Sequence, residues 1–156
     1  MVSRCPKVAL RCAAVSLTVA VVIPVASGIG AVSETRSIDT KLVGTWTRTL
    51  TKVDIKRAHV VPGEVEHAYP GLVVVLIVKK NGAAEVKLKG QSGPIRWQGR
   101  LVPLGAHRLH IAGMPLDVPN VYRWRVSGRL LTFAKISDRD ITGLRAAWFT
   151  GVWKRK

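Results

Sequence analysis

Residues 71–90 constrain the fold more than any other segment, and they read GLVVVLIVKKNGAAEVKLKG. An apolar, mostly β-branched run extends from Leu72 to Val78. Asn81-Gly82 follows, a pair that supplies the positive φ angles of a type I′ turn. Along 84–89, apolar and charged residues then alternate, as they do on a strand with one buried face. The segment therefore predicts a β-hairpin whose second strand buries one face.

The same alternation recurs along the rest of the chain. It predicts eight strands, at 42–50, 72–78, 84–89, 95–102, 107–112, 121–126, 129–136 and 151–156. Short antiparallel strands with tight turns must pair their edges, and eight of them are enough to close a barrel. The predicted fold is therefore all-β, an eight-stranded antiparallel up-and-down β-barrel.

Two interruptions of the strand pattern predict short helices. Thr51 is followed three residues later by Asp54, a variant of the capping box, so one or two helical turns are expected at 51–59, directly after the first strand. A second helical turn is expected within 139–150.

The stretch VYRWRVSGRLLTF, from residue 121, alternates aromatic and cationic side chains. On a strand this alternation points one set inward and the arginines outward. Extended to the neighbouring strands, it predicts an inward set comprising Trp97, Leu101, Leu109, Ile111, Tyr122, Trp124 and Val126, with His107 on the same face as Leu109. A barrel with this lining either holds a small apolar ligand or is filled by its own side chains.

The first 33 residues do not belong to the predicted barrel. They carry three basic residues, then an uncharged apolar run over 12–32, and polar residues follow at once. This order is typical of a secretory signal peptide, with cleavage expected after Ser27 or Gly28. Because the run is long enough to span a bilayer, an uncleaved membrane anchor is the alternative. Either way, a domain over 34–156 is expected outside the cytoplasmic membrane.

The charge balance of this domain suggests a second kind of partner. Three of the 25 basic residues lie in the leader, which leaves 22 against nine acidic ones, formally +13. Such a charge attracts anionic cell-envelope polymers or lipids, and we do not expect nucleic acid as the natural partner. The outward side chains that would make this contact are Arg96, Arg100, Arg123 and Arg125.

The sequence offers little for catalysis, metal or cofactor binding. Both cysteines lie in the leader, and no Gly-x-Ser-x-Gly motif is present. His107 and His110 are three residues apart, so on a strand they face opposite sides and cannot share a metal. We therefore expect a non-enzymatic protein without a disulfide, a metal or another cofactor.

Two acidic pairs are candidates for a cation site, but two carboxylates are too few for a closed calcium site. One pair flanks Val65, and the other, Asp138 and Asp140, flanks Arg139. We expect solvated loops, with Arg139 neutralising its two neighbours.

The segment LVGTWTR, with Gly44 and Trp46, resembles the Gly-x-Trp signature that opens the first strand of calycin barrels, the group of lipocalins, fatty-acid-binding proteins and avidins. The C-terminal sequence from Tyr122 onward also resembles small exported lipocalin-like proteins of bacteria. The resemblance implies a basic residue near the chain end, Arg155 or Lys154, lying across the ring of Trp46. It further implies carriage of a small apolar molecule, and we expect a monomer. The long helix and the disulfide of typical lipocalins are not evident in this sequence. The resemblance therefore identifies neither the subfamily nor the ligand.

Overall fold

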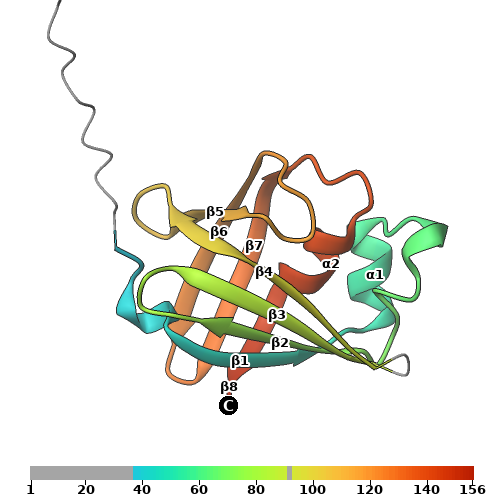
Figure 1. Cartoon of the computed structure of the whole chain (residues 1–156), viewed down its shortest axis with the longest axis horizontal. Helices are drawn as coiled ribbons and strands as arrows, with labels where there is room; N and C mark the ends of the chain where they lie inside the picture. The colour runs from blue at the N-terminus through green and yellow to red at the C-terminus, as the bar shows by residue number, and fades with distance from the viewer. Residues whose placement is uncertain (1–36, 91–92) are drawn as a thin grey trace, which may run out of the picture. The chain divides into compact units, whose positions relative to one another are not determined.

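Eight antiparallel strands close into a single up-and-down barrel, as the sequence predicts (Figure 1). The computed structural model describes residues 37–90 and 93–156, so the predicted signal peptide lies outside the described residues. The strands are β1 (Gly44–Thr49), β2 (Val73–Val78), β3 (Ala83–Gly90), β4 (Gly93–Pro103), β5 (Arg108–Ala112), β6 (Asn120–Ser127), β7 (Leu130–Asp138) and β8 (Gly151–Arg155). The helices are α1 (Lys52–Ala58) and α2 (Leu144–Phe149), with 3₁₀ turns η1 (Thr40–Leu42) and η2 (Pro62–Glu64).

The barrel closes between its first and last strands. Each strand pairs with the next along the chain, and β8 returns to β1 with Trp46 opposite Arg155 and Thr47 opposite Lys154. The predicted strand at 42–50 is slightly shorter in the structure, because Leu42 belongs to η1 and Gly44 begins β1.

The hairpin at 71–90 is present, but its turn differs from the predicted type I′ turn, because Gly82 has a positive φ and Asn81 does not, and the turn is closed between Lys79 and Gly82. Gly82 adopts a φ of +80° and its N–H donates to the carbonyl of Lys79 at 2.9 Å. From Val73 opposite Lys89 to Val78 opposite Ala84, the two strands pair without a shift in register. The connection therefore has three residues, Lys80 to Gly82, and the alternating burial of β3 agrees with the register that it sets.

The up-and-down order gives the barrel two ends with different contents. One end, at the left and lower left of Figure 1, carries the start of β1, the β2–β3, β4–β5 and β6–β7 turns and the end of β8. We call it the turn end. The opposite end carries α1, η2, the β5–β6 loop and α2, and we call it the helix end.

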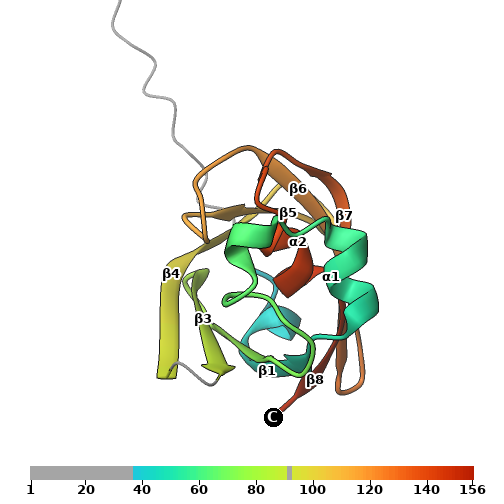
Figure 2. The same cartoon turned by 90° about the vertical axis from the view of Figure 1, so that its right-hand side faces the viewer.

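Both predicted helical segments are present at the helix end. Helix α1 begins with the predicted capping box, in which Thr51 and Asp54 exchange side chain to backbone hydrogen bonds. Helix α2 lies within the ring of strands when the barrel is viewed from the helix end (Figure 2), and all six of its residues are buried. The barrel is therefore closed at this end by its own chain.

The aromatic side chains of α2 fill the barrel interior. Trp148 packs against Trp97 with ring centroids 4.5 Å apart. Phe149 contacts three rings on three strands, those of Tyr122, Phe133 and Trp153, at 5.8–6.2 Å. These contacts form a continuous aromatic core between α2 and the strands.

Candidate functional site

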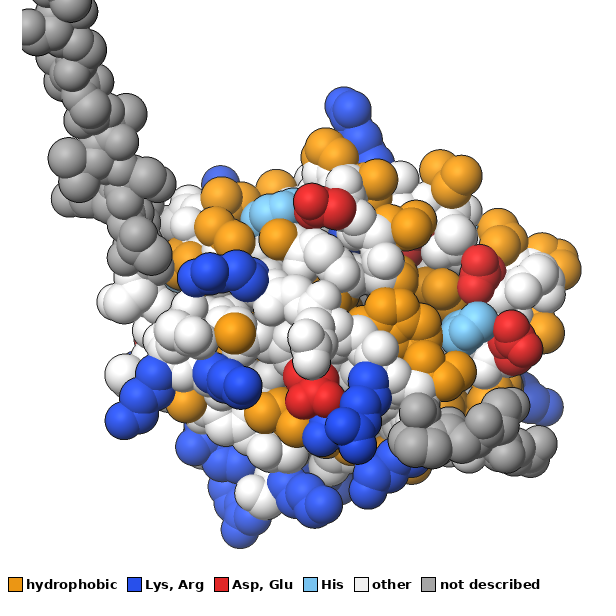
Figure 3. All heavy atoms as spheres, viewed as in Figure 1, with side chains coloured by type: hydrophobic (Ala, Val, Ile, Leu, Met, Phe, Trp, Pro, Cys, Tyr) orange, Lys and Arg blue, Asp and Glu red, His pale blue; other side chains and the backbone are white. Residues whose placement is uncertain are grey.

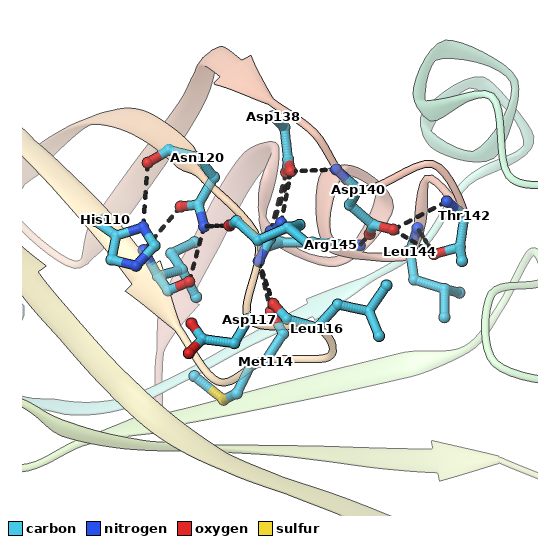
Figure 4. Close-up of polar contacts among 12 residues, drawn as sticks. His110, Met114, Leu116, Asp117, Asn120, Asp138, Asp140, Thr142, Leu144 and Arg145 are labelled. Atoms are coloured by element: carbon cyan, nitrogen blue, oxygen red, sulfur yellow. Dashed lines mark hydrogen bonds and ion pairs between the residues drawn. The ribbon is translucent and has the colours of Figure 1, made fainter. Parts of the chain in front are cut away.

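A buried arginine fastens α2 inside the barrel (Figure 4). Arg145 is fully buried and pairs with Asp138 at 2.7 Å, while its Nη1 donates to the carbonyl of Leu116 at 2.6 Å. The Asp138 carboxylate also accepts a hydrogen bond from the hydroxyl of Tyr122. The group therefore joins α2 to β6, β7 and the β5–β6 loop, and we call Arg145, Asp138 and Tyr122 the arginine latch.

The latch shifts the proton affinities of its own members. Burial alone would raise the pKa of Asp138, but hydrogen bonds from Arg145, Tyr122 and the Asp140 backbone outweigh it and hold the pKa below its usual value. Burial and the neighbouring Asp138 charge raise the pKa of Tyr122. Asp138 is therefore ionised and Tyr122 is a neutral donor over the ordinary pH range.

The structure corrects the expectation of a solvated loop at Asp138 and Asp140. Only 2% of the Asp138 side chain is exposed, and its partner is Arg145 instead of Arg139. Asp140 accepts from the backbone N–H groups of Thr142 and Arg145 at 2.9 and 2.8 Å. The chain turns back after β7 into the barrel, which brings an arginine seven residues away onto Asp138.

Asn120 fixes the neighbouring β5–β6 loop. Its side-chain oxygen accepts from the N–H of Ile111 and its amide donates to the carbonyl of the same residue, both at 2.8 Å. His110 Nδ1 lies 3.2 Å from the Asn120 carbonyl oxygen.

The charged nitrogens of Arg145 all have partners, so the latch stabilises the closed end and presents no free group for chemistry.

A second buried arginine, on β1, holds the C-terminal end of α2. Arg48 pairs with Asp54 of α1 at 2.8 Å and donates to the carbonyls of Trp148 and Thr150. The sequence prediction missed it, although strict alternation on β1 already placed residue 48 on the inward face with Trp46 and Leu50.

A hollow of small-molecule size lies at the turn end. It has a volume of about 530 Å³ and is lined by Ser37, Ile38, Asp39, Thr40, Leu42, Pro103, Gly105, Ala106, His107, Leu109 and Trp124. We call it the turn-end pocket. Segment 37–42 forms one wall and the β4–β5 turn another. Its volume falls within the range of small-molecule sites.

The β4–β5 turn is held against the aromatic side chain of the pocket. His107 adopts a φ of +57°, its carbonyl accepts from the N–H of Trp124 at 2.9 Å, and its ring meets the Trp124 ring edge-on at 5.1 Å. His107 thus belongs to the turn and is exposed, which corrects the prediction that it shares the inward face of β5 with Leu109.

A clasp between the first and last strands of the barrel holds the wall formed by segment 37–42. Arg155 Cζ lies 4.4 Å from the centre of the Trp46 ring, the arrangement expected from the Gly44-x-Trp46 signature, and Arg155 Nη2 donates to the Lys41 carbonyl at 2.8 Å. Trp46 Nε1 donates to the carbonyl of Leu42 at 2.8 Å. The clasp therefore positions the residues that line the turn-end pocket.

A smaller hollow of about 320 Å³ adjoins this pocket and has a basic rim. It is lined by Lys41, His107, Arg123, Trp124, Arg125 and Val126. Trp124 and His107 line both hollows, so an occupant of one lies close to the cations of the other.

The structure divides the predicted inward set among several places. Leu109 and Trp124 line the turn-end pocket, and Val126 lines the adjoining hollow. The others lie deeper or at the helix end: Leu101, Ile111 and Tyr122 are buried in the core, and Trp97 is half-buried against Trp148. Helix α2 occupies the space that they would otherwise share. Segment 37–42 was not among the predicted lining, because no strand periodicity marks it.

The four outward arginines are exposed, and their partners differ. Arg96 Nε lies 4.0 Å from Glu85, and Arg100 Nη2 donates to the carbonyl of Asn81 at 3.0 Å. Arg123 and Arg125 line the hollow beside the turn-end pocket.

Two searches of the described residues, 37–90 and 93–156, were negative. They contain no group of three or more His, Cys, Asp or Glu side chains placed to hold a metal ion. They also contain no helix with the length and hydropathy needed to cross a membrane.

Comparison with known proteins finds a similarity among solved structures. No family model matches the chain, and no curated protein matches it. Among solved structures, the chain is similar to a lipoprotein, YedD, from Klebsiella pneumoniae, at 14% identity and a TM-score of 0.45. The match covers 77% of this chain and 75% of that protein.

Proposed function

We propose that this protein is an exported, lipocalin-like carrier that binds a small, largely apolar molecule in the turn-end pocket. The observation that supports the proposal is the 530 Å³ hollow between segment 37–42 and the β4–β5 turn. Export rests on the basic, then apolar, character of residues 1–33.

The pocket lining combines apolar side chains with polar residues that could orient a ligand. Its large apolar residues are Ile38, Leu42, Leu109 and Trp124, of which little is exposed, so most of the apolar area removed from water on binding would be the ligand's own, at roughly 25 cal/mol for each Å². Polar residues, Asp39 among them, make up a comparable part of the lining. Sites for small molecules typically combine apolar contact with a few polar groups.

A fluorescence titration with the neutral probe N-phenyl-1-naphthylamine tests the proposal. Ala106→Phe places a ring in the pocket from an exposed turn position, so it should block the probe without unfolding the barrel. Ala134→Phe, on the exposed face of β7, is the matched control and should bind as the unmodified protein does. Probe binding that is absent, or that Ala106→Phe leaves unchanged, would contradict the proposal.

An alternative function is binding of soluble anionic envelope polymers by the outward arginines. The exposed pair Arg123 and Arg125 beside the pocket favours it. Polymer affinity would then fall steeply with salt and be lost in Arg123→Glu/Arg125→Glu. Binding of a neutral apolar probe should be nearly insensitive to salt, because no counterions are released. The salt dependence of polymer binding and that of probe binding therefore distinguish the two functions.

A further inference from the structure

The acidic residues of the described chain lie mainly at the helix end of the barrel. Acidic residues of the helix end are Asp54, Glu64, Glu66, Asp117, Asp138 and Asp140. Glu85 lies within β3, and of the described acids only Asp39 lies at the turn end, where its side chain accepts from the backbone of Lys41.

Cations occur at both ends, since Lys52, Lys56, Arg57 and Arg139 lie at the helix end, but there they are offset by the acidic residues. The turn end has more cations and one described acid. Its cations are Lys41, Lys79, Lys80, Arg100, Arg108, Arg123, Arg125, Arg129, Lys154, Arg155 and Lys156, and all except Arg155 are exposed. Figure 3 shows one face of the molecule, with Lys and Arg gathered toward its left and lower parts and acidic side chains beside a histidine at its right. The net positive charge of the described residues is therefore concentrated at the turn end.

Two leucines of the turn end are exposed. Leu104, in the β4–β5 turn, is 47% exposed and lines a shallow hollow with His110 and Asp117. Leu130, at the start of β7, is 44% exposed, follows Arg129 and lies opposite Lys154. Exposed apolar side chains beside cations suit a lipid interface, where the charges contact headgroups and the apolar tips enter the acyl boundary.

We propose that the turn end is a docking surface for an anionic lipid bilayer, with Lys79, Lys80 and the neighbouring cations on the headgroups and the two leucines at the interface. The inference goes beyond the proposed carrier function and does not depend on it, because neither Lys79 nor Lys80 lines the turn-end pocket. Bilayer docking would bring the mouth of that pocket to the lipid surface.

Vesicle sedimentation tests the proposal with two variants of equal net charge. The protein, in the processed form that its host produces, is mixed with phosphatidylcholine vesicles with or without phosphatidylglycerol. The measured quantity is the ratio of the two partition coefficients, which removes any contribution of the apolar run. Lys79→Glu/Lys80→Glu reverses two exposed charges at the turn end, and Lys52→Glu/Lys56→Glu reverses two on α1 at the helix end.

We expect the turn-end variant to lower this ratio at least about tenfold, and the helix-end variant to lower it much less. Equal losses in both variants would show attraction by net charge alone and would overturn the docking surface. A ratio near one for the unmodified protein would overturn it as well. Neither outcome bears on the carrier function, because both variants should still bind the neutral probe.

A second pair of measurements distinguishes a bilayer from a polyanion. Leu104→Ser/Leu130→Ser should weaken binding to phosphatidylglycerol vesicles while leaving heparin and DNA binding unchanged, since polymers use the cations alone. If vesicle binding is insensitive to the leucines, the lipid assignment is wrong and the surface is a general polyanion site.

Discussion

Removing the arginine of the latch should produce one of the largest single-residue losses of stability in the barrel. In Arg145→Ala the Asp138 carboxylate stays in the protein with 2% of its side chain exposed and loses its charged partner. Breaking a buried pair from one side typically costs about 3–5 kcal/mol. We expect a loss of this size in the free energy of unfolding at pH 7.

This loss should depend on pH in a defined direction. In the unmodified protein the pKa of Asp138 is held below its unfolded value, so its contribution is present above about pH 4 and is lost as the pH falls through the folded value. Without Arg145, burial should raise the pKa of Asp138 instead, so the folded variant favours the protonated carboxyl. The difference between the two proteins should therefore shrink toward acidic pH.

Urea unfolding at pH 7 and near pH 3 measures both effects. Arg139→Ala is the matched control, because Arg139 is exposed beside Asp138 and should cost less than about 0.5 kcal/mol. Asp138→Asn/Arg145→Met should recover part of the loss, since no unpaired charge remains buried. A cost of Arg145→Ala below about 1 kcal/mol, or one equal at both pH values, would refute the role given to the latch.

Three further predictions concern the barrel ends and the leader. Trp46→Ala should cost about 3–5 kcal/mol and Arg155→Ala about 1–2, with a coupling energy in the double mutant; purely additive losses would remove the clasp. Gly151→Ala should cost about 2–4 kcal/mol in thermal or urea unfolding, because its φ is +128° and a Cβ would lie within 3.0 Å of the Arg48 guanidinium; a neutral effect would contradict this. Sequencing the extracellular protein should find its N-terminus between residues 28 and 34, whereas an intact Met1 on cytoplasmic protein would exclude export.

The barrel was predictable because local signals agree along the chain. Asn81-Gly82 between two apolar runs predicts the β2–β3 hairpin, although not its turn type, and the capping box at Thr51 predicts the start of α1. The short segment at 151–156 was expected to close the sheet and does so as β8. Each of these elements is specified by residues within a few positions of one another.

The interior was less predictable because it depends on contacts between distant segments. Helix α2 is one turn and a half long, and its sequence does not reveal that Trp148 enters the barrel to meet Trp97. The prediction paired Asp138 with its sequence neighbour, whereas Arg145 reaches it only after the chain reverses. Arg48 was visible as a cation on an inward face, but its partner Asp54 lies on a separate element.

The five indole N–H resonances of an ¹⁵N-labelled sample test the central claim, that a ligand occupies the turn-end pocket, most directly. Titration with N-phenyl-1-naphthylamine should shift the resonance of Trp124, which lines the pocket. Trp148 and Trp153 should not shift, because their indole groups donate to the carbonyls of His67 and Phe149 in the closed part of the barrel. Shifts of Trp148 and Trp153 with Trp124 unchanged would place the ligand in the interior and contradict the account.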